Sequence, residues 1–406
     1  MNEPKLRFKA DDGSQFPDWE RKCLSDIASF HSGLTYTQDD VVDSENGILV
    51  FRSSNIQNGR ISYNDNVYVD KELKERNYVK LHDIVVCVRN GSKALVGKNA
   101  LVTESDLNAT WGAFMTVIRA KQNYEFVHQY LNSTFFKKEM YKDSGTATIN
   151  QITTAMLNDC KLFVPSLPEQ QKIAEFLSTI DTVIAKQKET VSAWEERKKG
   201  VMQKLFSQEV RFKADDESDF PEWEEKKLGE VMSVKDVKQI PTEEAPLMAF
   251  IAYQGVAEKG DRYDRSFLVK SDDKKYKRTD FNDFIYSSNN LDVGSIGLNK
   301  YGSAVISVVY EIFTFKDGFN PDCMNLLIQQ PRIMSSIIRY RQGCLYGQYK
   351  IHSRDFLNVL ISAPCLAEQQ KIADCLSSLD EVIEKQKATL AAWEELKKGL
   401  LQQMFV

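Results

Sequence analysis

The sequence lacks long apolar runs, paired cysteines and clustered histidines. No apolar stretch among the 406 residues approaches the length of about 20 residues that a membrane-spanning helix needs. The first residues, MNEPKLRFKADD, are charged and do not form an export signal, so we expect a cytoplasmic protein without membrane contact. The seven cysteines include no C-x-x-C pair and the four histidines no metal-binding spacing, so we expect neither disulfides nor a metal site.

Motifs for nucleotide binding and catalysis are also missing. Segment 91–98, GSKALVGK, has one residue too many between its glycines for a phosphate-binding loop, and Asn99 stands where Ser or Thr is required. The sequence contains no G-x-S-x-G nucleophile motif and no F-x-G-x-G or N-P-P-Y motif of base methyltransferases. Acidic pairs such as Asp11–Asp12 lie in charged stretches that are typical of a solvated surface. We expect no catalytic residue and no cofactor in this chain.

The sequence does contain an internal repeat. Residues 169–206 match residues 368–405 at 24 of 38 positions. Residues 7–27 match residues 211–231 at 13 of 21 positions. The stretches between these blocks share little sequence. The chain therefore consists of two copies of a constant frame, each of which carries a different insert.

The two inserts, residues 28–164 and 232–363, have matching layouts. Short β-branched runs between Gly and Asn predict strands, and apolar positions with a period of 3.6 predict helices. In the first insert we predict strands at 47–53, 83–89, 114–120 and 160–165 and one helix at 124–140. In the second we predict strands at 246–253, 283–288, 304–316 and 358–364 and one helix at 324–340. Each half is thus an α+β domain followed by a long helix.

The two long helices carry apolar residues in steps of four and three over about five heptads, which is typical of a coiled coil. The predicted seam of the first helix is Ile173, Leu177, Ile180, Ile184, Gln187, Val191, Trp194, Lys198, Val201 and Leu205. That of the second is Ile372, Leu376, Leu379, Ile383, Gln386, Leu390, Trp393, Lys397, Leu400 and Met404. Polar residues at matching seam positions, such as Gln187 and Gln386, cost stability but fix register. Two amphipathic helices in separate cores are the alternative.

The chain connections favour an antiparallel coiled coil. The first helix leads out of the first insert and the second helix begins where the second insert ends, so an antiparallel pair needs no long connection. A helix of 38 residues is roughly 57 Å long at about 1.5 Å per residue. We therefore predict a pseudo-two-fold tandem repeat in which the coiled coil separates two different domains. A parallel pair is the second choice.

Polar loops recur at matched places in the two inserts and carry side chains of the kinds that contact DNA. Arg pairs with guanine edges, Asn and Gln pair with adenine edges, and Ser, Thr and Lys hold phosphates. In the first insert the candidates are Arg52, Ser53, Ser54, Asn55, Gln57, Asn58, Arg60, Arg89, Asn90, Ser92, Lys93, Lys98, Ser144, Thr146, Thr148, Asn150 and Gln151. In the second they are Tyr253, Gln254, Lys259, Arg262, Ser287, Ser288, Asn289, Asn290, Asn299, Lys300, Tyr301, Gln342, Tyr346, Gln348, Tyr349 and Lys350. Ordinary loop polarity is the alternative for any single residue.

The charge of the chain argues against a nucleic-acid binder that works alone. The formal net charge is -5 at pH 7, whereas such binders are usually basic. The first insert has 15 basic and 15 acidic residues, and the second has 17 basic and 15 acidic residues. Either the basic side chains cluster on one face, or another subunit supplies part of the phosphate contact.

The repeated motifs resemble those of the specificity subunit of type I restriction–modification systems. The resemblance rests on PKLRFKADD…FPDW and VRFKADD…FPEW, and on PSLPEQQKIAEFLSTID and APCLAEQQKIADCLSSLD. Because each of the latter two segments opens a long heptad helix, the resemblance covers the whole chain. The second copy departs from the first only slightly at the helix entrance, with Ala367 where the first has Pro168.

The resemblance implies that each insert is a target-recognition domain, which reads one half of a bipartite site in double-stranded DNA. The implied parts are recognition domains at 1–164 and 211–363, with repeated segments at 1–27 and 211–231, and long helices at 165–210 and 364–406. The coiled coil would set the spacer between the half-sites. The glutamines and glutamates of the two EQQ segments are expected at the helix start and in a docking surface for partners.

The resemblance also implies partner subunits. The helical frame would dock two methyltransferase subunits that methylate adenine, and restriction subunits, which translocate DNA and cut it, would join them. S-adenosylmethionine, ATP and Mg²⁺ are expected on these partners, so the chain itself is expected to be non-catalytic. The alternatives are a coiled-coil scaffold, a bifunctional enzyme, and the DNA-reading subunit of a related restriction system with bipartite sites.

Overall fold

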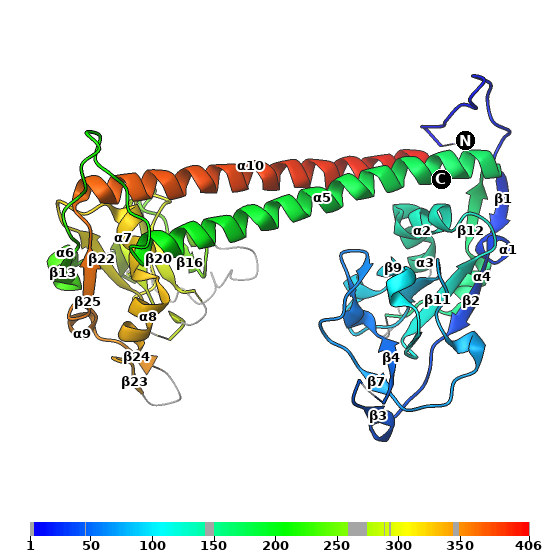
Figure 1. The fold of residues 1–406 in the computed structure, drawn as a ribbon, viewed down its shortest axis with the longest axis horizontal. Helices are drawn as coiled ribbons and strands as arrows, with labels where there is room; N and C mark the ends of the chain where they lie inside the picture. Colours follow the sequence, from blue (N-terminus) through cyan, green and yellow to red (C-terminus); the bar gives the residue numbers. More distant parts are fainter. Residues whose placement is uncertain are drawn as a thin grey trace. The chain divides into compact units, whose positions relative to one another are not determined.

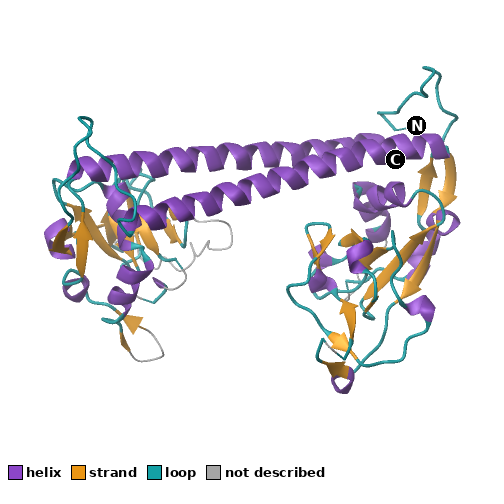
Figure 2. Cartoon of the chain, viewed as in Figure 1, coloured by secondary structure: helices purple, strands orange, loops and turns teal. Residues whose placement is uncertain are grey.

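The chain folds into two compact units, each of which contains strands, short helices and a segment of both long helices (Figures 1 and 2). Unit 1 comprises Met1–Thr190 and Gln386–Val406, and unit 2 comprises Val191–Lys385. The computed structural model describes residues 4–44, 46–142, 150–258, 274–287, 289–291, 294–343 and 349–405. None of the helices in these ranges combines the length and the apolar character that a bilayer crossing requires.

The described residues of unit 1 form two four-stranded sheets and two strand pairs. The first sheet has the order β2 (Ala28–Ser32), β11 (Met115–Ala120), β8 (Ile84–Cys87) and β9 (Asn99–Leu101). The second has the order β10 (Ala109–Trp111), β4 (Ile48–Phe51), β7 (Tyr68–Val69) and β3 (Val41–Val42). The pairs are β1 (Glu20–Cys23) with β12 (Lys161–Val164), and β5 (Ile56–Gln57) with β6 (Arg60–Ile61). The four strands predicted in the first insert are therefore confirmed, with narrower bounds.

Strand β8 is central to the packing of unit 1. Its four residues are all buried, because one face meets the second sheet and the other meets the helices. Burial on both faces explains why this strand reads as a continuous apolar run. The α-helices of the domain are α1 (Leu24–Ile27), α2 (Tyr124–Asn132), α3 (Thr134–Tyr141) and α4 (Thr154–Asp159). The 3-10 turns are Gln38–Asp40, Ser53–Asn55, Glu75–Asn77, Lys93–Leu95 and Glu104–Asp106.

The prediction of a single helix at 124–140 is wrong. The chain breaks at Ser133, whose backbone is extended (φ -71°, ψ 157°), so α2 ends and α3 begins there. The hydroxyl oxygen of Ser133 accepts a hydrogen bond from Phe136 N at 3.2 Å, which caps the new helix. The apolar spacing continues across the break, so periodicity alone does not reveal it.

Unit 2 repeats the layering with different sequences. Its first sheet has the order β14 (Met232–Val234), β22 (Glu311–Phe315), β19 (Phe284–Tyr286) and β20 (Ile296–Leu298). Its second has the order β15 (Lys238–Gln239), β18 (Tyr276–Thr279) and β21 (Ala304–Ile306). The pairs are β13 (Glu224–Lys227) with β25 (Leu360–Ala363), β16 (Ala249–Ile251) with β17 (Gly255–Ala257), and β23 (Gln342–Gly343) with β24 (Tyr349–Lys350). The helices are α6 (Leu228–Val231), α7 (Pro321–Ile328), α8 (Pro331–Ile338) and α9 (Ser353–Phe356). The matched layouts of the two inserts are confirmed.

Three predictions for the second insert are wrong in detail. The long strand expected at 304–316 is two strands, β21 and β22, joined by a turn. The helix expected at 324–340 is broken into α7 and α8, because Pro331 occupies the start of α8 and has no N–H for a continuous helix. The prediction also places no strand between residues 289 and 303, where the structure has β20.

The long helices α5 (Leu167–Phe206) and α10 (Leu366–Met404) form the predicted antiparallel coiled coil. All twenty seam residues are buried or half-buried. In unit 1, Asp181 pairs with Lys397 at 2.5 Å and Lys188 pairs with Glu394 at 2.8 Å. Residue numbers therefore rise along one helix as they fall along the other. Unit 2 shows the same direction, since Lys198 pairs with Asp380 at 2.6 Å and Leu205 packs near the start of α10.

The repeated segment before each domain holds the start of the following long helix. In unit 1, Arg7 donates from Nε and Nη2 to the two carboxylate oxygens of Glu169, at 3.0 and 2.9 Å. Trp19 Nε1 donates to the same carboxylate at 3.0 Å. In unit 2, Arg211 makes the equivalent contacts with Glu368, at 3.1 and 2.9 Å. Both glutamates are 0% exposed, so these ion pairs are internal parts of the constant frame.

The expectation that the EQQ segments form a docking surface is wrong for most of their residues. The first glutamine of each, Gln170 and Gln369, is also buried and donates to a main-chain carbonyl before the helix. Only the second glutamines, Gln171 and Gln370, are exposed. These sequences are repeated because the helix start needs them, and their place at the helix start is confirmed.

Candidate nucleic-acid interface

In unit 1, three of the predicted polar segments meet around Asn90. Its amide Nδ2 donates to Ser53 Oγ at 3.2 Å, and its main-chain N donates to Asn150 O at 3.3 Å. Asn150 Nδ2 donates back to Gly91 O at 3.1 Å, and Arg89 forms a β-bridge with Gln151. Segments 52–60, 89–98 and 150–151 therefore form one surface, although they lie far apart in the sequence.

The hairpin β5–β6 presents polar side chains on the first of these segments. Asn58 and Gly59 both have positive φ, 53° and 74°, as a two-residue turn of type I′ requires. Gln57, Asn58 and Arg60 are exposed around this turn. Asn55 is not available to a ligand, because it is 0% exposed and its amide donates to Ser62 O and two further acceptors. The prediction that Asn55 contacts DNA is therefore wrong; it stabilises the loop.

The remaining candidates of unit 1 differ in exposure. Arg89, Ser92, Lys93 and Gln151 are exposed. Arg52, Ser53, Ser54, Asn90, Lys98 and Asn150 are half-buried. Arg52 is also neutralised by Asp65, at 2.9 Å. Ser144, Thr146 and Thr148 lie outside the described residues.

In unit 2, the equivalent three segments also contact one another. Tyr253 N, after β16, donates to Gly294 O at 3.0 Å, and Tyr349 N, in β24, donates to Asn289 Oδ1 at 2.7 Å. The loop that follows β19 therefore contacts both the segment after β16 and strand β24. The loop after β8 likewise contacts two other polar segments in unit 1. Tyr253 is 86% exposed with φ 61°, and its ring lies against Gly294, where a Cβ would come within 2.3 Å.

The structure does not bring all candidates of unit 2 together. Lys300 and Tyr301 are exposed but lie at the other end of β19, where Lys300 Nζ donates to Asn282 Oδ1 at 2.7 Å. Asn299 is 0% exposed and Ser287 is 4% exposed, so the prediction that these two contact DNA is wrong. The exposed candidates near the three segments are Tyr253, Gln254, Asn289, Asn290, Gln342, Tyr349 and Lys350. Lys259, Arg262, Ser288, Tyr346 and Gln348 lie outside the described residues.

A turn between two strands borders each surface, and the sequence interpretation did not predict that either turn is exposed. The turn between β10 and β11 places Phe114, 58% exposed, beside Arg89, whose main-chain N donates to Phe114 O at 3.2 Å. The turn between β21 and β22 exposes Val308 and Val309, at 49% and 62%. Alternating hydrophobicity assigns these residues to strands, and only the position of the turn reveals that they reach the surface.

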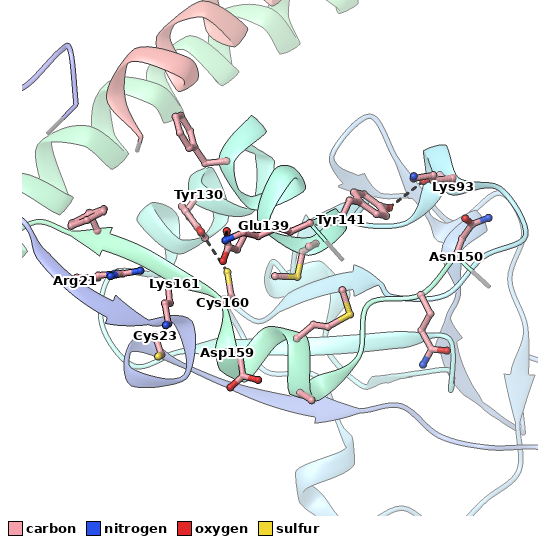
Figure 3. Close-up of a pocket in the computed structure, with 17 residues that line it drawn as sticks. Arg21, Cys23, Lys93, Tyr130, Glu139, Tyr141, Asn150, Asp159, Cys160 and Lys161 are labelled. Atoms are coloured by element: carbon pink, nitrogen blue, oxygen red, sulfur yellow. Dashed lines mark hydrogen bonds and ion pairs between the residues drawn. The ribbon is translucent and has the colours of Figure 1, made fainter. Parts of the chain in front are cut away.

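A hollow of about 940 Å³ adjoins the surface of unit 1 (Figure 3). Its lining includes Lys93 and Asn150 of the candidate surface. Tyr130 and Cys160 also line it; Tyr130 Oη lies 3.5 Å from Cys160 Sγ, and burial raises the pKa of this thiol to about 11. A thiol with so high a pKa is a poor nucleophile, so Cys160 is not a reactive cysteine at neutral pH. No group of three or more His, Cys, Asp or Glu side chains suited to a metal ion occurs among the described residues.

Known proteins share both the sequence and the fold. Residues 17–192 and 221–392 match the model of the type I restriction modification DNA specificity domain. The chain is 30% identical over 167 residues to the StySPI specificity subunit of a type I restriction enzyme of Salmonella potsdam. This match covers 40% of this chain and 36% of that subunit. It is 26% identical over 415 residues to the MjaX specificity subunit of Methanocaldococcus jannaschii, which covers 97% of this chain and 94% of that one.

The fold is similar to that of the S subunit of the type I restriction–modification system from M. genitalium, with a TM-score of 0.54 and 15% sequence identity over 100% of this chain and 99% of that one. Two matches to the specificity domain together span most of the sequence. The chain therefore belongs to the family of type I restriction–modification DNA specificity subunits.

Proposed function

We propose that each unit reads one half of a bipartite site in double-stranded DNA. The observation that carries this proposal is the convergence of three polar segments in both units, around Asn90 in one and Asn289 in the other. Two surfaces with the same construction and different side chains suit two different half-sites. The exposed side chains on them are mainly Asn, Gln, Arg, Lys and Tyr, which supply donors and acceptors for base edges and phosphates.

The chain would read DNA without modifying it, inside a larger cytoplasmic complex. Two methyltransferase subunits would dock on the helical frame and bring S-adenosylmethionine, and restriction subunits would bring ATP and Mg²⁺. The charge balance supports a shared grip on DNA, since the first insert has 15 basic and 15 acidic residues. Neutralising many phosphates requires a surplus of Lys and Arg, which partner subunits would supply.

The coiled coil would set the length of unread sequence between the half-sites. Support comes from the register of the two helices. Gln187 bonds to Gln386, and the ion pairs Lys198–Asp380 and Lys397–Asp181 join the helices before and after this point. Removing one heptad from each helix is expected to shorten the unread gap and leave both half-sites unchanged. An unchanged gap in a folded variant would contradict the spacer role.

The direct test is selection from a pool of random duplexes by this chain in complex with a methyltransferase subunit. We expect a two-part motif with methylated adenines, and no methylation by the chain alone. Exchanging residues 28–164 for the same region of a relative should alter one half-site only. Absence of any enriched motif with the partner present would favour a protein scaffold, and methyl transfer by the chain alone would favour an enzyme.

A further inference from the structure

Arg89 is the best-placed base reader in unit 1. It lies two residues after the end of strand β8, is exposed, and has its guanidinium carbon 5.2 Å from the centre of the Phe114 ring. Its main-chain N donates to Phe114 O, and its β-bridge to Gln151 holds it on the other side. The backbone of this arginine is therefore fixed by two neighbouring segments.

Exposure of Phe114 is imposed by the fold. The turn between β10 and β11 is tight, with Met115 N donating to Gly112 O at 2.8 Å. The residues on either side, Trp111 and Met115, are both 1% exposed, so the turn cannot rotate to bury the phenyl ring without exposing them. The guanidinium of Arg89 lies over this ring, and the cation–π attraction between them reduces the mobility of a long and otherwise flexible side chain.

The other arginines of this surface are less suited to reading a base. Arg52 is paired with Asp65, at 2.9 Å, and also donates to Asp65 O. Arg60 lies at the hairpin turn and has no stacking ring among the described residues. Arg89 makes no ion pair within the described part of the chain. The N–H groups of a guanidinium lie in its plane, so a ring against one face leaves them free to bond.

We propose that Arg89 donates to O6 and N7 of a guanine in the half-site read by unit 1, and that Phe114 is the positioning residue that holds the guanidinium for this contact. This inference rests on the proposed function and adds a base identity to it. A bidentate pair of Arg with guanine discriminates against the other bases, whereas a phosphate contact carries no sequence information. The segment after β19 in unit 2, SSNN, has no arginine, so this contact is proposed for the half-site of unit 1 only.

The test compares the selected motif of wild-type complex with those of Arg89→Ala, Arg89→Lys, Phe114→Ala and Phe114→Tyr. Arg76→Ala is the matched control, because Arg76 is an exposed arginine in the 3-10 turn Glu75–Asn77, outside the three candidate segments. For both Arg89 variants we expect discrimination at one guanine to fall by roughly 10- to 100-fold, with the other half-site unchanged. Phe114→Ala should lose part of this discrimination at the same guanine. Phe114→Tyr keeps an aromatic ring beside Arg89 and should retain the discrimination of the wild-type complex.

Other outcomes would overturn the inference. If Arg89→Ala weakens binding equally on all sequences and reduces its salt dependence, Arg89 contacts phosphate. If the motif is unchanged in a variant with wild-type thermal stability, Arg89 does not read a base. If Phe114→Ala leaves discrimination intact, the positioning role is wrong. In each case a two-part motif of the wild-type complex would leave the proposed function standing, and its absence would remove the proposed function itself.

Discussion

Gln187 and Gln386 occupy the same position in the two copies of the repeat and bond to each other. Gln187 Nε2 donates to Oε1 of Gln386 at 2.7 Å and to its main-chain O at 3.0 Å. In an antiparallel pair, equivalent residues face each other at one point along the seam. A shift of one heptad would separate these amides and leave both among apolar neighbours. The pair therefore marks and stabilises the register.

Replacing one of these glutamines should therefore behave differently from replacing both. Gln187→Leu alone leaves the amide of Gln386 without its partner, and we expect a loss of about 1 kcal/mol in the free energy of unfolding. The double variant, with Leu at both positions, should be more stable than either single variant, because leucine suits the seam. Urea unfolding of all four proteins measures the coupling. Additive effects would show that the two residues do not act as a pair.

The ion pairs of the seam offer a second comparison between equivalent residues. Asp181 and Asp380 accept from Lys397 and Lys198, but only Asp181 also accepts from Gln129, at 2.8 Å. We expect Asp380→Asn to cost roughly 0.5–1 kcal/mol, as exposed ion pairs do, and Asp181→Asn to cost more. Both losses should shrink in 1 M salt, measured by thermal unfolding. Equal losses that do not depend on salt would contradict this explanation.

The buried carboxylate of Glu169 should matter far more than the surface ion pairs. Glu169→Ala leaves the Arg7 guanidinium without its main partner in a largely enclosed place, and we expect a loss of about 3–5 kcal/mol. Trp19 donates to the same carboxylate, so its fluorescence should change in the folded state. Glu175→Ala, an exposed position on the same helix, is the control and should cost under about 0.5 kcal/mol. A small loss at Glu169 would mean that the constant frame does not depend on this contact.

The constant frame was predictable from sequence because its signals are repeated and periodic. The heptads locate the seam, and the shared defects at Gln187 and Lys198 distinguish it from an ordinary apolar face. The breaks at Ser133 and Pro331 were not predicted. Apolar periodicity continues through both, and a serine or a proline inside such a pattern is compatible with a bend as well as with a new helix.

The candidate surface was predictable only in part, because loop composition does not show burial. Asn55 and Asn299 have the same polarity as their exposed neighbours, yet each satisfies main-chain groups in the interior. Phe114 was assigned to a strand on hydrophobicity, although the turn places it outside. Which polar residues face inward depends on contacts between segments that are distant in sequence.

Asn90 and Asn289 should each affect one half-site. Asn90→Ala removes the bond that ties the hairpin segment to the loop after β8, and Asn289→Ala removes the bond to Tyr349 N. Because a hydrogen bond of this kind stabilises by about 0.5–1.5 kcal/mol, we expect affinity for the corresponding half-site to fall by about 2- to 10-fold. Competition binding with duplexes altered in one half-site measures this. The exposed Asn158→Ala is the control, and effects of Asn90→Ala on both half-sites would contradict separate reading.

His128 should make the stability of unit 1 depend on pH. Burial, with a smaller contribution from Lys397, lowers its pKa from 6.5 to about 4, and its Nε2 is enclosed without a hydrogen-bond partner. Below pH 6.5 the unfolded chain binds a proton that the folded chain does not, so protonation favours unfolding. The contribution of this residue is therefore fully present above pH 6.5 and is lost as the pH falls towards 4. At pH 5 we expect a loss on the order of 1–2 kcal/mol.

The second unit supplies the matched substitution for His128. Asn123 and Asn320 cap α2 and α7 and donate to the repeat-equivalent Gln171 and Gln370, so the position that corresponds to His128 is Asn325. His128→Asn should flatten the slope of unfolding free energy between pH 6.5 and 4, measured by urea unfolding at several pH values. The pKa of His31 is also lowered by burial, so a residual slope should remain, and removing it requires a further substitution there. An unchanged slope in His128→Asn would show that folding does not lower the pKa of His128, so that its enclosure does not control the acid sensitivity of unit 1.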